Sequence, residues 1–189
     1  MLIHHPPLSS TAADMKPKAK SKSTKLSPAA QKARKTVADT AKQINSLLQQ
    51  SRTALEEGEL QVSHDIASKA CSLLPADSTN TNPIELLGEI NIELENFEPA
   101  LQCFTEAIRR RENVDPKTFE LGEEGKFLWM GQLDEGDQAE NWYIKGVDIL
   151  QHLLERNTDD VQQKCIREKL CSTYCSLIEL FLTDLWCHP

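Results

Sequence analysis

The sequence lacks several features that mark common protein classes. It has seven glycines in 189 residues and no glycine-rich phosphate-binding loop, and no segment approaches the roughly 20 apolar residues that span a bilayer. The first ten residues, MLIHHPPLSS, lack the charged start and apolar segment of a secretory signal. No segment alternates apolar and polar residues as a strand does. These absences argue against a membrane-spanning, secreted or β-rich protein.

The cysteines do not form a metal-binding pattern, because no CxxC pair is present. Without an export signal, we expect reduced, buried thiols. Cys171 and Cys175 share a helical face and could bind zinc with Cys187 or His188, but the spacing of a compact zinc site is missing. We therefore expect no metal and no cofactor. The six cysteines are Cys71, Cys103, Cys165, Cys171, Cys175 and Cys187.

Catalytic patterns are missing as well. The sequence contains no GxSxG, no HExxH and no Ser, His and Asp at a spacing that indicates a triad. His64 and His152 are isolated. The DEGD segment at 134–137 lacks the alternating oxygen ligands of a calcium loop, so we interpret it as an acidic turn. We predict that the protein is not an enzyme.

Charge is divided unevenly along the chain. Residues 1–43 contain nine Lys or Arg and two Asp, whereas the other 146 residues contain 12 Lys or Arg and 27 Asp or Glu, a net charge of −15. A basic N-terminal segment is thus joined to an acidic body. A field of one sign attracts partners of the opposite sign, so we expect a basic protein partner and no direct binding of nucleic acid or membrane.

The first 26 residues are rich in Pro, Ser, Thr and Lys. Such a segment cannot offset the entropy lost on ordering, so we expect residues 1–26 to be disordered. Their lysine run predicts a nuclear-import signal and an import receptor as a partner, with a solvated tail as the alternative. The run consists of Lys16, Lys18, Lys20, Lys22 and Lys25.

From Ser27-Pro28 onward the apolar pattern is helical, and the helices come in pairs. In the second helix of a pair, a small, a large and a small residue follow at spacings of four and three, as in Ala100, Phe104 and Ala107. Corresponding positions recur 37 residues apart (Ser63 to Ala100) and then 39 residues apart (Ala100 to Ala139). A 34-residue unit with short insertions explains these periods.

This unit resembles the tetratricopeptide repeat (TPR). We predict an all-α fold, a right-handed TPR-type α-solenoid with a disordered basic N-terminal tail. The last helix has a wide apolar surface and no partner helix, so we expect a C-terminally truncated form. The repeat domain covers 27–189, with pairs at about 44–75, 81–112 and 120–155 and an unpaired helix at 159–185.

Aromatic residues are only 5% of the sequence, yet four of them lie in the third pair. Solenoid hairpins bury their faces only against neighbours, so we interpret these side chains as packing between repeats. No feature supports the alternative, an aromatic box for a ligand. The four are Phe127, Trp129, Trp142 and Tyr143.

The third pair is distinctive in another way. KFLWMGQLDEGDQAENWYIKGVDIL, preceded by NPIELLGEINIELENFEPALQCFTEAI and followed by LCSTYCSLIELFLTDL, resembles one fungal TPR family. That family comprises dedicated assembly chaperones of the large-subunit ribosomal protein L-four. The resemblance covers about residues 15–186, and family members carry further repeats after the LTDL segment.

The first helix of each TPR pair lines the concave groove. Glu85, Glu89 and Glu93 are spaced by four on such a helix, so three like charges share one face and repel one another. A basic partner would relieve this repulsion, whereas a solvated acidic face is the alternative. We expect partner contacts from Glu56, Glu85, Glu89, Glu93, Glu124, Glu179 and Asp184.

TPR co-chaperones that grip acidic C-terminal tails need Lys and Asn in this groove. At the comparable positions this sequence has Leu48, Arg52, Glu85 and Glu89. We therefore expect the groove to repel a carboxylate-rich tail.

The resemblance implies a function. Family members bind the long Lys- and Arg-rich internal loop of newly made L-four until large-subunit assembly in the nucleus. They thereby shield the loop from RNA, a polyanion that binds cations strongly. We thus expect a non-enzymatic chaperone, cytoplasmic and nuclear, that binds this basic extension through an acidic concave groove. The alternative is a generic TPR scaffold for protein–protein interactions.

Overall fold

A computed structural model of the 189-residue chain describes residues 27–185. The predicted basic tail, 1–26, and the last four residues lie outside the described residues. The described residues fall into two units, 27–36 and 37–185. The hairpins and the site described below belong to the second unit.

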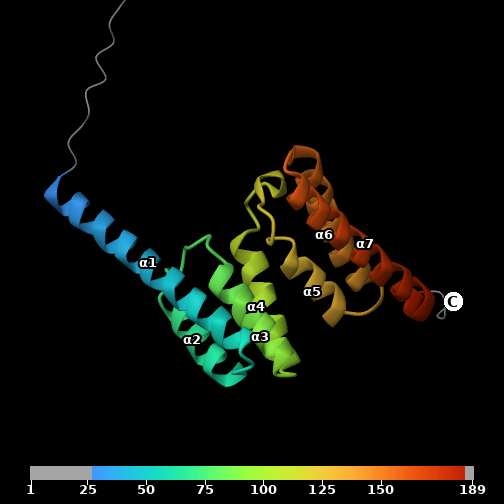
Figure 1. Ribbon diagram of the computed structural model, residues 1–189, viewed down its shortest axis with the longest axis horizontal. Coiled ribbons are helices and arrows are strands. Elements are labelled where there is room, and N and C mark those ends of the chain that lie inside the picture. Colours follow the sequence, from blue (N-terminus) through green and yellow to red (C-terminus); the bar gives the residue numbers. More distant parts are fainter. Residues whose placement is uncertain (1–26, 186–189) are drawn as a thin grey trace, which may run out of the picture. The chain divides into compact units, whose positions relative to one another are not determined.

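Seven α-helices and two short helical turns make up the described chain, which contains no strand. The predicted all-α class is therefore confirmed for these residues. Within unit 37–185, the turns after α1, α3 and α5 lie on one side and the loops after α2, α4 and α6 on the other (Figure 1). The elements are α1 (Pro28–Glu56), α2 (Leu60–Ser72), α3 (Asn82–Glu93), α4 (Phe97–Arg110), η1 (Pro116–Thr118), α5 (Gly125–Leu133), α6 (Gly136–Arg156), α7 (Asp160–Leu180) and η2 (Phe181–Leu185).

Several helix ends follow from local chemistry. Pro83 stands in the first turn of α3, where its missing N–H would have no helical partner. Gly58 adopts a φ of +78° between α1 and α2, a left-handed conformation that costs glycine little. The Asp159 carboxylate accepts a hydrogen bond from the Gln162 backbone N–H (2.8 Å) and so caps α7.

Small residues let the two helices of each hairpin approach closely. In the first hairpin, the Ser51 hydroxyl donates to the Ser63 carbonyl (2.9 Å), and the Ser63 hydroxyl donates to the Ser51 carbonyl (2.8 Å). In the second, a Cβ on Gly88 would lie 2.8 Å from the Phe104 ring; in the third, one on Gly131 would lie 2.9 Å from the Tyr143 ring.

The third hairpin is shorter than the second. Gly88 precedes Phe104 by 16 residues, whereas Gly131 precedes Tyr143 by 12. The difference of four residues is about one helical turn, and α5 has nine residues where α3 has 12. The same contact between a small and a large residue is therefore built closer to the turn.

The aromatic residues pack as core side chains. Trp129 of α5 stacks on Phe104 of α4, with ring centroids 6.3 Å apart, and so joins the second hairpin to the third. Phe127 and Trp142 pack at 6.3 Å within the third hairpin, where Tyr143 covers Gly131. The predicted packing role is confirmed, although only Trp129 makes a ring–ring contact between hairpins.

The cysteine prediction is only partly correct. Burial raises the pKa of the Cys71 thiol to about 12 and that of Cys103 to about 11, so both stay protonated. Cys171 and Cys175, however, are exposed on α7 rather than buried. Sequence spacing placed them on one helical face, but no later helix of the described chain covers that face.

The described residues contain neither a membrane-spanning helix nor a cluster of metal ligands. None of the helices between 27 and 185 is long and apolar enough to cross a membrane. No group of three or more His, Cys, Asp or Glu side chains in that range could hold a metal ion.

Candidate functional site

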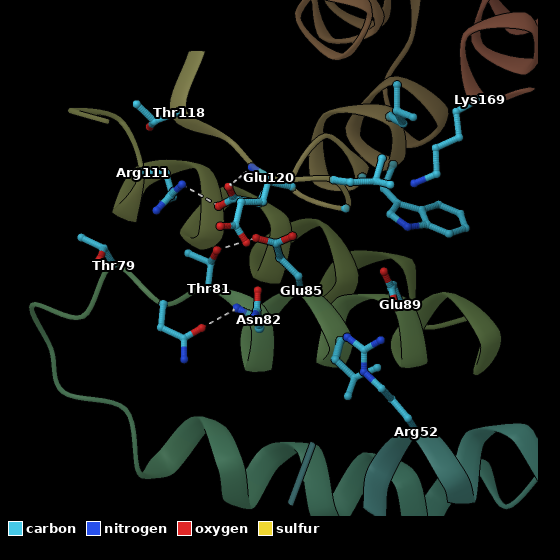
Figure 2. A pocket seen from close by; sticks show the side chains of 18 of the residues that line it. Arg52, Thr79, Thr81, Asn82, Glu85, Glu89, Arg111, Thr118, Glu120 and Lys169 are labelled. Atoms are coloured by element: carbon cyan, nitrogen blue, oxygen red, sulfur yellow. Dashed lines mark hydrogen bonds and ion pairs between the residues drawn. The ribbon is translucent and has the colours of Figure 1, made fainter. Parts of the chain in front are cut away.

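A polar hollow of about 810 Å³ lies in unit 37–185. Its lining comes from α1, the loop before α3, α3 itself, the end of α4, residues 118–125, α5 and α7. Figure 2 shows Arg52 extending toward Glu89 from α1 and Lys169 entering from the opposite side on α7. The first helices of successive hairpins thus contribute to this hollow, as the TPR pattern predicts.

Glu85 is not a free carboxylate. Its Oε1 accepts hydrogen bonds from the Thr81 hydroxyl and from the Lys126 ammonium, the latter at 3.0 Å. The Lys126 side chain is 0% exposed, and its Nζ also donates to the Glu123 carbonyl at 2.7 Å. Glu85 is therefore neutralised by a lysine of the next hairpin.

Glu124 is neutralised in the same way. Its side chain is fully buried just before α5, and its carboxylate accepts hydrogen bonds from the Lys169 ammonium and from the Gly122 backbone N–H. A negative charge at the start of a helix is also favoured by the helix dipole. A carboxylate with these partners is not available to another protein.

A third ion pair, between Arg111 and Glu123, lies in the lining of the hollow. Arg111 Nη2 lies 2.6 Å from Glu123 Oε1, and the guanidinium carbon lies 4.8 Å from the centroid of the Phe119 ring. The Arg111 Nε is buried without a hydrogen-bond partner. Arg111 is thus held by one carboxylate and one aromatic face.

Glu89 differs from the other carboxylates of the hollow. Burial raises its pKa, Arg52 lowers it, Glu85 raises it and Lys169 lowers it, in that order of importance. Among residues 27–185, no hydrogen bond or ion pair within 4.0 Å holds the Glu89 side chain. It faces two cations without a direct contact to either.

This hollow is less acidic than the groove that the sequence predicts. Four glutamates and three Lys or Arg line the hollow, so its lining has a net charge of −1. Glu85, Glu89 and Glu93 do lie on one helix, α3. However, lysines from α5 and α7 neutralise two of the expected contacts, Glu85 and Glu124. Because these lysines offset the glutamates, charge alone no longer argues against binding of an acidic peptide. Leu48 is a core residue and does not line the hollow.

The other predicted contact residues lie away from the hollow. Glu56 and Glu93 are exposed at the ends of α1 and α3, and Glu179 is exposed near the end of α7. Asp184 belongs to η2, but its side chain lies outside the described residues, as do the five lysines of the import-signal candidate. The predicted contacts thus divide into two groups. Glu85, Glu89 and Glu124 lie in or beside the hollow, whereas Glu56, Glu93 and Glu179 are exposed elsewhere.

Glu56 and Glu93, but not Glu179, belong to a larger acidic edge, which we define as the carboxylates at the turns within the three hairpins. Eight of these nine side chains are exposed, Asp134 being half-buried, and none forms an ion pair with Lys or Arg of the described chain. The turns lie on one side of unit 37–185 (Figure 1). The nine are Glu56, Glu57, Glu59, Glu93, Glu95, Glu98, Asp134, Glu135 and Asp137.

The sequence did not reveal Lys126 and Lys169, the lysines that pair with Glu85 and Glu124. Lys126 lies in the apolar run KFLWM, and a charged residue in such a run is a signal of a buried ion pair, since a buried charge needs a partner. Nothing in the sequence identified that partner, which is 41 residues away. Lys169 gave no signal, because it stands beside other charged residues, Arg167 and Glu168.

Comparison with known proteins identifies relatives of this chain. Over 139 residues, 73% of this chain, the sequence is 36% identical to a Schizosaccharomyces pombe protein named "Probable assembly chaperone of rpl4". Over 114 residues, 59% of the chain, it is 28% identical to an Emericella nidulans protein of the same name. This chain is related to the fungal assembly chaperones of Rpl4. No protein-family model matches the sequence.

The relationship covers part of those proteins. The matched regions are 39% and 30% of the two curated relatives, so the chain spans less than half of their length. Among solved structures, "Assembly Chaperone of RpL4 (Acl4) (Residues 1-338)" matches with a TM-score of 0.66 and 24% identity over 75% of this chain and 56% of that one. The predicted TPR-type solenoid is thereby confirmed.

Proposed function

We propose that this chain is a non-enzymatic chaperone that binds a basic segment of the ribosomal protein Rpl4. The observation that carries the proposal is the 36% identity to a protein named as an assembly chaperone of rpl4, over most of this chain. The repeat fold supports it, because stacked hairpins offer an extended surface for a long polypeptide. The net charge of −15 on residues 44–189 supports a basic client.

The client contact that we propose is the acidic edge, together with Glu89. None of the carboxylates of the edge forms an ion pair with Lys or Arg of the described chain, so a cationic partner would not first have to displace a lysine. Glu85 and Glu124 do have lysine partners, and a client cation would have to break those pairs. We therefore assign Glu56 and Glu93 to contact and Glu85 and Glu124 to structure.

Charge reversal tests this assignment. We expect Glu93, Glu95 and Glu98→Lys to weaken binding of purified Rpl4 in a titration. The matched control reverses three exposed carboxylates away from the turns, Asp77, Asp148 and Glu155→Lys, and so gives the same net charge and nearly the same long-range attraction. Equal losses in the two variants would show that the turns make no specific contact.

The runner-up is a generic TPR scaffold. The observation that favours it is Arg52, a cation of the hollow that forms no ion pair in the described chain and would suit a carboxylate of some other partner. Recovery of bound proteins from a fungal lysate at rising salt separates the two. Selective recovery of Rpl4 supports the chaperone, whereas a broad, salt-insensitive set of partners supports the scaffold.

Transport into the nucleus is a further part of the proposal. The lysines of the import-signal candidate, Lys16 to Lys25, lie outside the described residues, and their role stays a prediction. We expect a fluorescent fusion to concentrate in the nucleus and to lose that concentration when the five lysines become Ala. An unchanged distribution would contradict the import signal.

A further inference from the structure

Two ion pairs of the same kind, each with at least one fully buried partner, join neighbouring hairpins near their first helices. At the step from α3 to α5, Glu85 pairs with Lys126; at the step from α5 to α7, Glu124, which directly precedes α5, pairs with Lys169. Each time the carboxylate comes from the earlier hairpin and the lysine from the later helix. We propose that Lys126 and Lys169 are positioning residues that set the spacing of successive hairpins, and thereby the shape of the hollow.

The surroundings of Lys126 show why this residue can fix a position. Its Nζ donates to the Glu85 carboxylate at 3.0 Å and to the Glu123 carbonyl at 2.7 Å. The Phe119 and Phe127 ring centroids lie 5.1 and 5.6 Å from the same atom. The ammonium is thus held on several sides by groups from two hairpins.

Apolar contacts alone would fix the junction less well. The second and third hairpins also meet through Phe104, Met130 and the Trp129 ring. Apolar attraction is non-directional, so such surfaces can slide with little loss. A hydrogen-bonded buried charge cannot slide without losing its partners, and that loss is costly. Lys126 therefore fixes the relative position of the second and third hairpins more firmly than the apolar contacts alone would.

Glu124 and Lys169 serve the next junction by the same physics. Glu124 is 0% exposed and has two donors, Lys169 and the Gly122 N–H, whereas Lys169 remains 39% exposed. Because Glu124 precedes α5 directly, holding it also fixes where that helix begins relative to α7. This role of the two lysines does not depend on which partner the chain binds.

The first experiment replaces the buried pair by apolar residues of similar length, Glu85→Met with Lys126→Met. Such replacements often leave stability unchanged or higher, so we expect native helicity by circular dichroism. The readout is ¹⁹F NMR of protein labelled with 5-fluorotryptophan, with the Trp129 resonance assigned by its loss in Trp129→Phe. We expect this resonance to broaden or split, because the hairpins sample more than one spacing.

A matched control removes an exposed pair of the same charges. Lys164 and Glu168 lie 3.8 Å apart with side chains 78% and 66% exposed, so Lys164→Met with Glu168→Met should leave the Trp129 resonance unchanged. A single, unshifted Trp129 resonance in the Glu85/Lys126 double variant would overturn the proposal. Single Lys126→Met leaves Glu85 buried and unpaired, so we expect its unfolding equilibrium constant to rise roughly 100-fold or more.

The second pair decides the matter if the double variant does not fold. Glu124→Gln keeps an acceptor for the Gly122 N–H but removes the charge, and Lys169 can reach water. We expect faster amide hydrogen exchange in α7 while exchange in α3 and α4 stays at the native rate. Unchanged exchange in α7, or equal acceleration throughout the chain, would contradict a role at this junction.

Discussion

Replacing Gly88 by alanine sets two effects of known sign against each other. In a helix interior, alanine is favoured over glycine by about 1 kcal/mol. A Cβ at position 88, however, would lie 2.8 Å from two atoms of the Phe104 ring, closer than real Cβ contacts. Phe104 is 0% exposed and cannot swing into solvent. Overpacking of this kind costs about 1–3 kcal/mol, so we expect a net loss of about 0–2 kcal/mol.

The assay is urea unfolding followed by circular dichroism, on four proteins that form a double-mutant cycle. In a Phe104→Leu background the ring atoms are gone, so Gly88→Ala should become stabilising by about 1 kcal/mol through helix propensity alone. The sign of the effect thus reverses between backgrounds. Gly125→Ala is the control, because a Cβ there meets no atom within 4 Å. A clear gain from Gly88→Ala in the native background would refute the close approach of α3 and α4.

Three further predictions concern titratable groups. Hydrogen bonds from Arg109 and Arg110 lower the pKa of Glu106 to about 2, so its carboxylate stabilises the fold above the usual carboxyl pKa, and this effect is lost as the pH falls toward 2. We expect Glu106→Gln to lower the free energy of unfolding at pH 7 by less than about 1 kcal/mol. An equal loss at pH 7 and near pH 2 would contradict this. Burial raises the pKa of Glu89, so its charge destabilises the fold at pH 7 and the penalty disappears at acid pH; Glu89→Gln should raise the melting temperature at pH 7 and not below the usual carboxyl range. Mass-spectrometric mapping after a thiol reagent at pH 8 should find Cys171 and Cys175 modified well before Cys71 and Cys103, whose thiols stay protonated.

Much of the fold could be predicted because it depends on local patterns. The small and large residues of each hairpin, such as Gly88 with Phe104, lie within one repeat, and their spacing is visible in the sequence. Pro28, Gly58 and Pro83 mark helix ends by backbone chemistry that needs no partner. The fold class followed from these signals, and the shorter third hairpin did not, since three of its four missing residues are lost from the end of α5 and one from the turn, and no local signal marks that change.

The electrostatics of the hollow could not be predicted, because they depend on contacts between hairpins. Glu85, Glu89 and Glu93 are equivalent by spacing, yet the first is buried, the second half-buried and the third exposed. This gradient comes from the hairpin packed beside α3, not from α3 itself. The partner of Glu85 lies 41 residues away, and no periodicity of a single sequence links them.

The most direct test of the central proposal is a titration of purified Rpl4 into this chain at several salt concentrations. If a basic client binds through exposed carboxylates, the affinity should fall as salt rises, because screening weakens exposed charge pairs. Reversal of Glu93, Glu95 and Glu98 should weaken binding at low salt more than reversal of Asp77, Asp148 and Glu155. Binding that is absent at every salt concentration, or that is unchanged by salt and by both triple variants, would contradict the account.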